Sequence, residues 1–413
     1  MSHPRALFTW SAQRDLAPLQ LAGGSGAWFF DASGIRYLDM ASTVVNANAG
    51  HNHPAILAAM RQQLSTLAVA GPGMTTQVRE QAARRLAQVT PEGLDSFLFT
   101  LGGADANEHA VKMARLITGR RKVICRVRSY HGATFGALSF SDDPRSEPFL
   151  PALPGVVRVK DPYCHRCPWD TTPDVCDRPC ASTVEEALHE AGPGTVAAVL
   201  METVPGTNGG YFPPLDYYQR VRAICDRHGV LLILDEVLTG FGRTGDWFAV
   251  EAYGIVPDMI TMGKGITSGH APLGAVAVHR KAASFFDEHL LMTGTTHTAH
   301  PISLAAALGN LDAFEQEGLI QRARELGQVL SARLAEIRSR HAGRVRDARA
   351  RGLYGCLELV DGADLASMKK NALLRGVHIL TRGRCLFIAP PLVISRDDLL
   401  HGLQVVDEVI AAS

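Results

Sequence analysis

The sequence predicts an α/β protein. Short apolar runs alternate with helical patterns along most of its 413 residues, which is typical of helices packed on a sheet. The runs are apolar at consecutive positions, so both faces of each strand are expected to be buried, as in a mainly parallel sheet. Six runs are candidate strands of this sheet: Ser96–Thr100, Lys122–Arg126, Val196–Met201, Val230–Leu234, Met259–Met262 and Ala275–Val278.

The two ends of the chain follow a different pattern. Residues Gly26–Asp39 predict a hairpin with its turn at Asp31–Gly34. The last third contains two long helical patterns, then short strands and a final helix. We therefore expect residues 1–48 and 303–413 to form a smaller α+β domain, and residues 49–302 to form a large domain.

The composition limits the partners. Lys+Arg 41 balance Asp+Glu 41, so no basic field is available for a polyphosphate or an anionic membrane surface, and neither nucleic acid nor membrane is expected to bind. The start, MSHPRALFTWSAQRD, has no apolar targeting core, which predicts a cytoplasmic protein. A net charge near zero leaves self-association open, and the expected ligand is a small molecule.

Two segments that follow candidate strands carry reactive groups. Asp235 and Glu236 end the strand in VLLILDEVLTGFGRTG, where a carboxylate faces the ligand crevice of an open α/β sheet, although such a carboxylate can equally cap the next helix. The run Gly240–Gly245 matches G-x-G-x-x-G, but it follows an acidic strand end instead of opening a helix. Lys264 lies between two glycines after the next strand. This setting permits close approach to a ligand and suits a Schiff-base lysine.

Two upstream segments offer groups for an anion and for a ring. Residues 101–108, LGGADANE, form a Gly-rich turn that opens a helix. The free N–H groups of such a turn suit a phosphate, and the same segment also suits a helix whose dipole is balanced by Asp105. Residues 129–132, SYHG, place Tyr130 and His131 beside a glycine.

These segments, in this order, resemble the class III, or omega, aminotransferases, which are pyridoxal-phosphate (PLP) enzymes of fold type I. The resemblance runs from about residue 20 to the APPL segment near the end, and the Asp235–Gly245 and Lys264 blocks are its most specific motifs. It implies a large domain with a mainly parallel, seven-stranded sheet and a smaller domain from both termini. It also implies a ping-pong transfer of an amino group from an amine or amino acid to a keto acid or aldehyde.

The resemblance assigns roles to the residues around the cofactor ring. Lys264 matches the lysine that binds the cofactor aldehyde and then moves a proton between substrate and cofactor. Asp235 matches the carboxylate that keeps the pyridine nitrogen protonated. Val237 and Tyr130 are expected on the two faces of the ring, with His131 nearby.

The resemblance also assigns the phosphate contacts. Gly103 and Ala104 are expected to donate N–H groups to the phosphate, and Glu202 to lie close to the cofactor. Thr296 matches a threonine that reaches the phosphate from a neighbouring subunit, which implies a homodimer with shared active sites. The family often has serine at Ala104 and glutamine at Leu238. These departures bear on cofactor affinity and leave the reaction class unchanged.

Residues near both termini bear on the substrate. Enzymes of this class for alpha-amino acids commonly have an arginine at the position of Phe387. Arg382 and Arg384 resemble the mobile arginine that omega-amine enzymes use to hold pyruvate, although both also suit a solvated turn. Trp10 lies in FTWSAQ, which resembles the start of taurine–pyruvate aminotransferases. We expect a donor with a terminal or remote amine, such as a beta-amino acid, taurine, a diamine or an aliphatic amine, and pyruvate as the acceptor.

Four of the eight cysteines lie together in a Pro-rich insertion near residues 161–182: Cys164, Cys167, Cys176 and Cys180. Their number suits a small tetrahedral thiolate site, but the middle gap differs from common zinc spacings, and free thiols fit as well. No metal is assigned.

Other functions share some of these features. A PLP-dependent decarboxylase, racemase or aminomutase needs the same lysine, aspartate and phosphate groups. A zinc-binding regulatory or nucleic-acid module uses the four cysteines, and a nicotinamide dehydrogenase uses GFGRTG.

Overall fold

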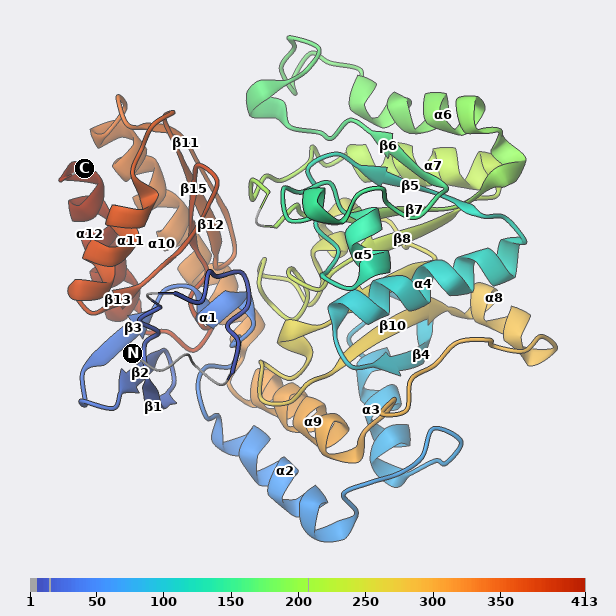
Figure 1. The fold of residues 1–413 in the computed structure, drawn as a ribbon, viewed down its shortest axis with the longest axis horizontal. Helices are drawn as coiled ribbons and strands as arrows, with labels where there is room; N and C mark the ends of the chain where they lie inside the picture. Colours follow the sequence, from blue (N-terminus) through green and yellow to red (C-terminus); the bar gives the residue numbers. More distant parts are fainter. Residues whose placement is uncertain (1–5, 15, 207, 413) are drawn as a thin grey trace.

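The structure is a computed structural model that describes residues 6–14, 16–206 and 208–412. Figure 1 shows two parts side by side. The larger part surrounds a seven-stranded sheet, and both ends of the chain meet in the smaller part. Residues 1–5, 15 and 413 of the predicted smaller domain lie outside the described residues, and the predicted domain boundaries near 48 and 302 stay predictions.

The central sheet has the strand order β4-β10-β9-β8-β7-β5-β6. β10 pairs antiparallel with β4 and with β9, whereas all other neighbours in this sheet are parallel. This confirms the predicted α/β fold with a mainly parallel sheet. The strands are β4 (Leu94–Thr100), β5 (Lys122–Arg126), β6 (Val156–Val159), β7 (Val196–Glu202), β8 (Leu231–Asp235), β9 (Met259–Met262) and β10 (Gly274–His279).

The six predicted strands all occur, within two residues of the predicted bounds. The prediction missed β6, which is a four-residue edge strand with only one fully buried residue. An edge strand of this length does not produce a long apolar run, so it carries little signal in the sequence.

Helices cover both faces of the sheet (Figure 1). Along β7, Ala198 and Leu200 pack on the same side as Ala106 and Ala110 of α4, whereas Val199 lies in the core on the opposite side. This alternation follows from the two-residue period of a strand. The helices that precede α9 in the chain are α1 (Ser42–Val45), α2 (Pro54–Thr66), α3 (Gln77–Ala87), α4 (Gly103–Thr118), α5 (Phe135–Phe140), α6 (Pro179–Ala191), α7 (Tyr217–His228) and α8 (Arg280–Ala283).

The smaller part contains two four-stranded sheets, β1-β2-β3-β13 and β11-β12-β15-β14. The predicted hairpin is confirmed as β2 and β3, and β13 joins it in parallel, pairing Val377 with Leu38. The strands are β1 (Leu21–Ser25), β2 (Trp28–Asp31), β3 (Arg36–Asp39), β11 (Val345–Arg351), β12 (Tyr354–Leu359), β13 (Val377–His378), β14 (Leu380–Arg382) and β15 (Cys385–Ile388). Of the remaining helices, α9 (Pro301–Gln316) packs on α2 and α3, whereas α10 (Leu319–Arg340), α11 (Leu365–Leu374) and α12 (Arg396–Ala411) belong to the smaller part.

A buried guanidinium ties segments from both termini to the loop after β8. Nη1 of Arg243 donates to the carbonyls of Leu353 (2.9 Å) and Pro390 (2.6 Å). Nη2 donates to Ser42 Oγ (3.1 Å) and Asn48 Oδ1 (2.7 Å). These acceptors are uncharged, and burial lowers the pKa of Arg243 to about 9.

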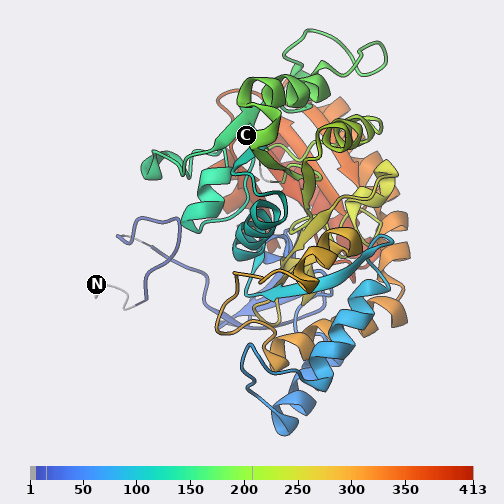
Figure 2. The same ribbon diagram turned by 90° about the vertical axis from the view of Figure 1, so that its right-hand side faces the viewer.

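The segment before β1 extends away from the body of the molecule in Figure 2. It carries the exposed apolar side chains Leu7, Phe8 and Trp10. None of the helices within the described residues combines the length and apolar character that crossing a bilayer requires.

Candidate active site

Three polar residues lie side by side at the carboxyl end of the central sheet. Glu202 ends β7 and is in register with Asp235, which ends β8. Asp235 is in turn in register with Thr261 of β9, and Lys264 follows β9 by two residues. The carboxyl ends of parallel strands form the ligand-binding edge of such a sheet. The topology therefore gathers residues from three separate segments at one edge.

Lys264 begins a short 3-10 turn in a left-handed conformation, with φ of +40°. Space favours the glycine before it, because a Cβ on Gly263 would make a tight contact of 3.1 Å with the backbone N of Gly103. Burial lowers the pKa of Lys264, although Asp235 and Glu202 act in the opposite direction. An amine that loses its proton more readily than usual is suited to nucleophilic attack.

Asp235 is fixed by three hydrogen bonds. Its Oδ2 accepts from Asn107 Nδ2 (2.7 Å) and is paired with His131 Nδ1 (2.9 Å). Its Oδ1 accepts from the backbone N–H of Val237 (2.9 Å). Asp235 is 5% exposed, so these bonds hold a largely desolvated carboxylate in one orientation.

Asn107 is a site residue that sequence reasoning missed. Its amide donates to Asp235 and to the backbone carbonyl of His131 (2.8 Å), and its Oδ1 accepts from Thr261 Oγ1 (2.7 Å). It lies four residues after Gly103 and therefore on the same face of α4. That spacing within LGGADANE is the one signal in the sequence that could have identified it.

The N-terminus of α4 lies against this edge. Its N-cap, Gly102, makes no side-chain capping bond, which leaves the first N–H groups of the helix available to an anion. Gly103 is also required by space, because a Cβ there would meet Val237 Cγ1 at 2.6 Å. Asp105 accepts from the N–H of Leu101 (2.7 Å), and this bond shapes the turn before the helix.

Glu202 organises the backbone beside the carboxylate edge. Its Oε1 accepts from the N–H of Tyr130 (3.0 Å), and its Oε2 accepts from the N–H of Gly206 (2.9 Å). Burial raises the pKa of Glu202. His131 follows Tyr130 in the chain, and its Nε2 is a buried atom without a hydrogen-bond partner among the described residues.

A second cluster, which sequence reasoning missed in part, lies over Tyr130. The guanidinium of Arg145 lies 3.5 Å from the centroid of the Tyr130 ring and 5.6 Å from that of Trp10. Asp143 holds Arg145 through two bonds of 2.6 and 2.9 Å and holds Arg382 through one bond of 3.0 Å. Although burial acts to raise it, the pKa of Asp143 is lowered by the hydrogen bonds from Arg145 and by the charge of Arg382. We call Tyr130, Asp143, Arg145 and Arg382 the arginine cluster.

A family model described as Aminotransferase class-III matches residues 10–410. The chain belongs to the class III aminotransferases. Because this class is PLP-dependent, the enzyme transfers amino groups with PLP as its cofactor, on the type I fold.

Individual relatives agree with this assignment. The aminotransferase is 39% identical over 347 residues to a probable aminotransferase of Mycobacterium tuberculosis, covering 82% of this chain and 74% of that protein. It is 34% identical over 417 residues to an omega-aminotransferase of Caulobacter vibrioides, covering 95% and 93%. A solved structure of taurine:2-oxoglutarate aminotransferase from Bifidobacterium kashiwanohense, in complex with PLP and glutamate, matches with a TM-score of 0.94 and 32% identity, covering 98% of this chain and 95% of that one.

The residues of this aminotransferase fit PLP. The uncapped N-terminus of α4 suits the phosphate, and the fixed carboxylate of Asp235 suits a protonated ring nitrogen. The buried Nε2 of His131, which has no hydrogen-bond partner within the described part of the chain, provides a polar atom for a ligand group. Leu238, where the family often has glutamine, packs in an apolar cluster with Tyr354 and Phe387, so it offers no hydrogen bond.

The structure does not bring every predicted residue to this site. Arg384 is instead paired with Asp361 at an exposed position, because the turn at Gly383 directs Arg382 and Arg384 to different partners. Thr296 is exposed in the loop before α9, and within the described residues no hydrogen bond ties it to Lys264 or Asp235. Ala104 lies in the first turn of α4, as expected for a residue whose backbone faces an anion.

Proposed function

We propose that this aminotransferase has omega-type specificity, taking its amino group from a donor whose amine is terminal or remote from an acid group and passing it to pyruvate. The proposal includes a homodimer with shared active sites, in which Lys264 and Asp235 carry the chemistry. The observation that carries the specificity is the arginine cluster, because it places two cations beside Tyr130 at the edge of the carboxylate site.

Bound PLP supplies an aldehyde carbon that takes up the donor's amino group and a ring that withdraws electrons from it. Lys264 Nζ, whose pKa is lowered by burial, holds and moves the proton of the substrate carbon. Asp235 Oδ1 accepts one hydrogen bond within the described chain, so it has capacity for a second, from the ring N–H. A hydrogen bond between such charged groups stabilises the protonated ring by about 1.5 to 3 kcal/mol.

The arginine cluster explains how one arginine can serve both substrates. Asp143 is held by Arg145 through two bonds, whereas Arg382 contributes one bond and is partly exposed. Arg382 can therefore leave Asp143 for a substrate carboxylate while Arg145 continues to neutralise Asp143. When the donor carries no acid group at this position, Arg382 returns to Asp143.

The environment of Phe387 favours the same specificity. It is fully buried and stacks on Tyr354 with ring centroids 6.1 Å apart. Phe387 brings no cation to the position where enzymes for alpha-amino acids commonly have an arginine, so an alpha-carboxylate that reached this position would lose its hydration without gaining a charged partner, which is unfavourable. A donor with its acid group elsewhere, or with none, avoids this cost.

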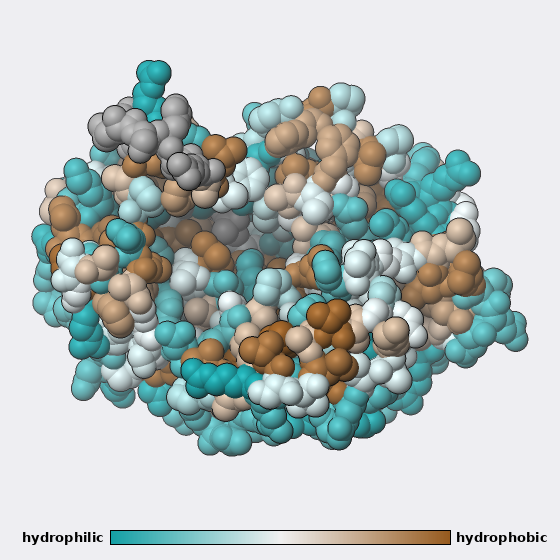
Figure 3. All heavy atoms as spheres, turned by 60° about the horizontal axis from the view of Figure 1, so that its bottom comes forward, coloured by the Kyte–Doolittle hydropathy of each residue, from teal (hydrophilic) through white to brown (hydrophobic). Residues whose placement is uncertain are grey.

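Exposed apolar side chains support the dimer. Figure 3 shows hydrophobic side chains gathered on the face that forms the bottom of Figure 1. The end of α2, the loop after it and the loop before α9 expose large apolar residues: Leu64, Leu67, Val69, Met74, Leu290 and Met292. Exposed apolar side chains of this kind favour coverage by a second copy, and Thr296 lies in the same loop as Leu290 and Met292.

The specificity test compares two acceptors. Arg382→Gln and Arg145→Gln are assayed with pyruvate and with an uncharged aldehyde of similar size. Loss of a charged partner costs about 2 kcal/mol or more, so pyruvate use should fall about tenfold to a hundredfold while aldehyde use changes little. Arg384→Gln is the matched control, because Arg384 is paired with Asp361 away from the cluster.

If Arg382→Gln and Arg145→Gln weaken both acceptors equally, the carboxylate role is wrong. Running 2-oxoglutarate beside pyruvate decides which keto acid is preferred. A preference for 2-oxoglutarate would replace pyruvate in the proposal and leave the role of the cluster intact.

Shared active sites are tested by mixing subunits. Dimers that combine Thr296→Ala with Lys264→Ala should regain activity, because one of their two sites then contains both an intact lysine and an intact threonine. Native mass spectrometry confirms that the subunits have exchanged. If the exchanged mixture is no more active than the two single variants added together, Thr296 does not act across the interface.

A further inference from the structure

The Pro-rich insertion between β6 and α6 brings four cysteines to one place. They come from a segment without regular structure other than the 3-10 turn Cys164–Arg166 and the start of α6. A single small cavity of about 10 Å³ is lined by all four: Cys164, Cys167, Cys176 and Cys180. All four are free thiols, and Cys180 is buried while the others are half-buried. None of them takes part in the aminotransferase chemistry described above.

We propose that Cys164, Cys167, Cys176 and Cys180 form a structural zinc site that stabilises this insertion. Four thiolates are a complete ligand set for tetrahedral zinc, and a site closed by four protein ligands is structural. The cavity is of ion size, whereas an organic ligand needs several hundred Å³. On binding, the four thiols release four protons to solvent, zinc gains four sulfur ligands, and no electrons are exchanged.

The charge around the site suits this assignment. A zinc ion with four thiolates carries two net negative charges. The guanidinium of Arg178 donates to Cys176 Sγ at 2.8 Å and to the Cys176 carbonyl at 2.8 Å. A cation in direct contact with a thiolate sulfur stabilises the negative charge that the metal site requires.

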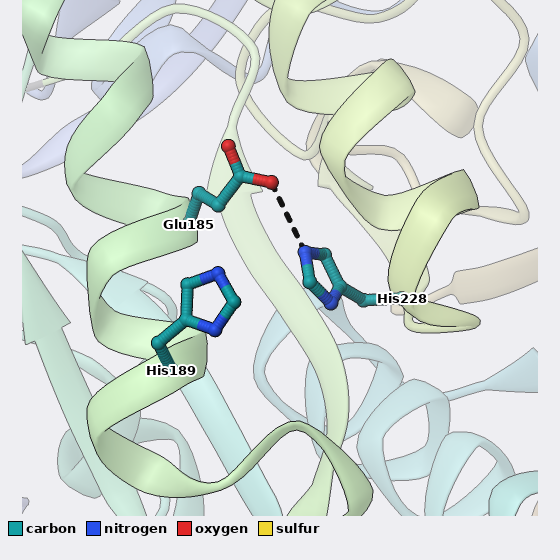
Figure 4. A group of neighbouring side chains, drawn as sticks. All are labelled: Glu185, His189 and His228. Atoms are coloured by element: carbon teal, nitrogen blue, oxygen red, sulfur yellow. Dashed lines mark hydrogen bonds and ion pairs between the residues drawn. The ribbon is translucent and has the colours of Figure 1, made fainter.

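The thiols need small movements to reach one ion. Rotation of a cysteine side chain between staggered positions moves its sulfur by about 3 Å. Such rotations are needed, because no three of the four cysteine sulfurs lie within 4.8 Å of one another. In the described part of the chain, the one set of three ligand atoms that does so belongs to Glu185, His189 and His228. These residues form a separate surface group between α6 and α7, with Glu185 Oε1 3.1 Å from His228 Nε2 (Figure 4).

The surface group is a poor structural site and a useful control. Glu185 is paired with Arg227 (2.8 Å) and with His228, and His189 is exposed. A metal there competes with an existing ion pair and leaves at least one ligand position to water. Zinc bound at Glu185, His189 and His228 should therefore be removed easily by washing with a chelator.

The insertion has a structural task that zinc would support. Arg166 pairs with Glu358 (2.8 Å) and His165 lies 3.2 Å from Asp347. Tyr163 donates to Glu358 as well. Asp347 and Glu358 belong to β11 and β12, so this insertion joins the larger part to the smaller part. A segment with so little core of its own is commonly held by a metal or disulfides.

The test measures zinc in the intact holoenzyme, purified without a metal-affinity tag and washed with a mild chelator. We expect about one zinc per chain in the wild type and in His189→Ala, which removes the surface group. Cys167→Ala with Cys176→Ala should lose it, and Cys176→His should retain it, because histidine replaces a thiolate ligand. Cobalt exchanged into the wild type should give the charge-transfer and d–d absorption of a tetrahedral thiolate site.

Three outcomes would overturn the proposal. The first is a wild type that contains no zinc and fails to bind one equivalent when zinc is added to the reduced protein. The second is zinc that disappears in His189→Ala and persists in the cysteine double variant. The third is intact mass under non-reducing conditions that shows disulfides among the four cysteines. If the double variant does not fold, release of zinc from the wild type by a thiol-specific mercurial gives the same decision.

Discussion

Replacing Asn107 with alanine tests whether the orientation of Asp235 matters for catalysis. The substitution removes one hydrogen bond to a buried carboxylate and two to neutral partners, Thr261 and the His131 carbonyl. Taking about 1.5 to 3 kcal/mol for the charged bond and about 1 kcal/mol for each neutral one, the free energy of unfolding should fall by roughly 4 kcal/mol. Asp235 keeps its bonds to His131 and Val237, so the protein should still bind PLP.

The assay separates stability from chemistry. Asn107→Ala is loaded with PLP, its cofactor content is measured, and the rate of the first half-reaction with an amine donor is followed by stopped-flow absorbance. We expect a rate about tenfold or more below wild type, since a loss of 1.4 kcal/mol in transition-state stabilisation already gives tenfold. Asn107 is a positioning residue here, because it acts through Asp235.

The matched control is Asn48→Ala. Asn48 is also a buried asparagine with one charged partner, Arg243 (2.7 Å), and one backbone carbonyl, that of Phe241 (2.7 Å). This variant should lose comparable stability while its half-reaction, corrected for cofactor content, stays near wild type. If Asn107→Ala, fully loaded with PLP, reacts at a rate within about twofold of wild type and of Asn48→Ala, then the orientation of Asp235 by Asn107 does not matter for catalysis.

Three further results are expected. Lys264→Ala should abolish turnover and any borohydride-stable attachment of the cofactor to the chain, read by intact mass; an attached cofactor in this variant would assign the amine to another residue. Asp235→Asn should fold and lose about a hundredfold in rate, because an amide cannot keep the ring nitrogen charged, and a loss of only a few-fold would count against that role. Burial raises the pKa of Glu236 to about 7 from 4.5; a carboxyl with a raised folded-state pKa stabilises the fold below about pH 4.5 and loses that contribution as pH rises through 7. The glutamine in Glu236→Gln has no titrating group, so the stability of this variant relative to wild type, followed by its melting temperature, should rise between pH 5 and 8 by at most about 3 kcal/mol. A difference in melting temperature that stays the same over this pH range would refute the raised pKa of Glu236.

The sequence predicted those candidate site residues whose signal is local. Asp235 and Lys264 each stand at a fixed position after a buried strand, and the parallel register of β7, β8 and β9 then brings them together. The same logic predicted six of the seven strands and the hairpin of the smaller part. Period-two and period-3.6 patterns report on burial within one segment, and that was enough for the fold class.

The missed residues depend on contacts between distant segments. Asn107 acts through Asp235 and Thr261, which are 128 and 154 residues away. Asp143 joins Arg382 across 239 residues. No periodic pattern in a single sequence encodes such pairings, so the arginine cluster became visible only in the folded chain. For the same reason, the sequence favoured Arg382 over Arg384 but could not show that the two arginines meet different partners.

The buried guanidinium of Arg243 has a consequence for biosynthesis. It lies in the loop after Asp235, and two of its acceptors, the carbonyls of Leu353 and Pro390, come from the last part of the chain. Until the ribosome has released that part, burying Arg243 would leave half of its hydrogen bonds unmade. Burial in that state is less favourable than leaving the guanidinium in water. The loop that follows Asp235 should therefore become ordered only after translation is nearly complete. A chain truncated before Pro390 should neither capture PLP nor escape proteolysis, however intact its lysine and aspartate are.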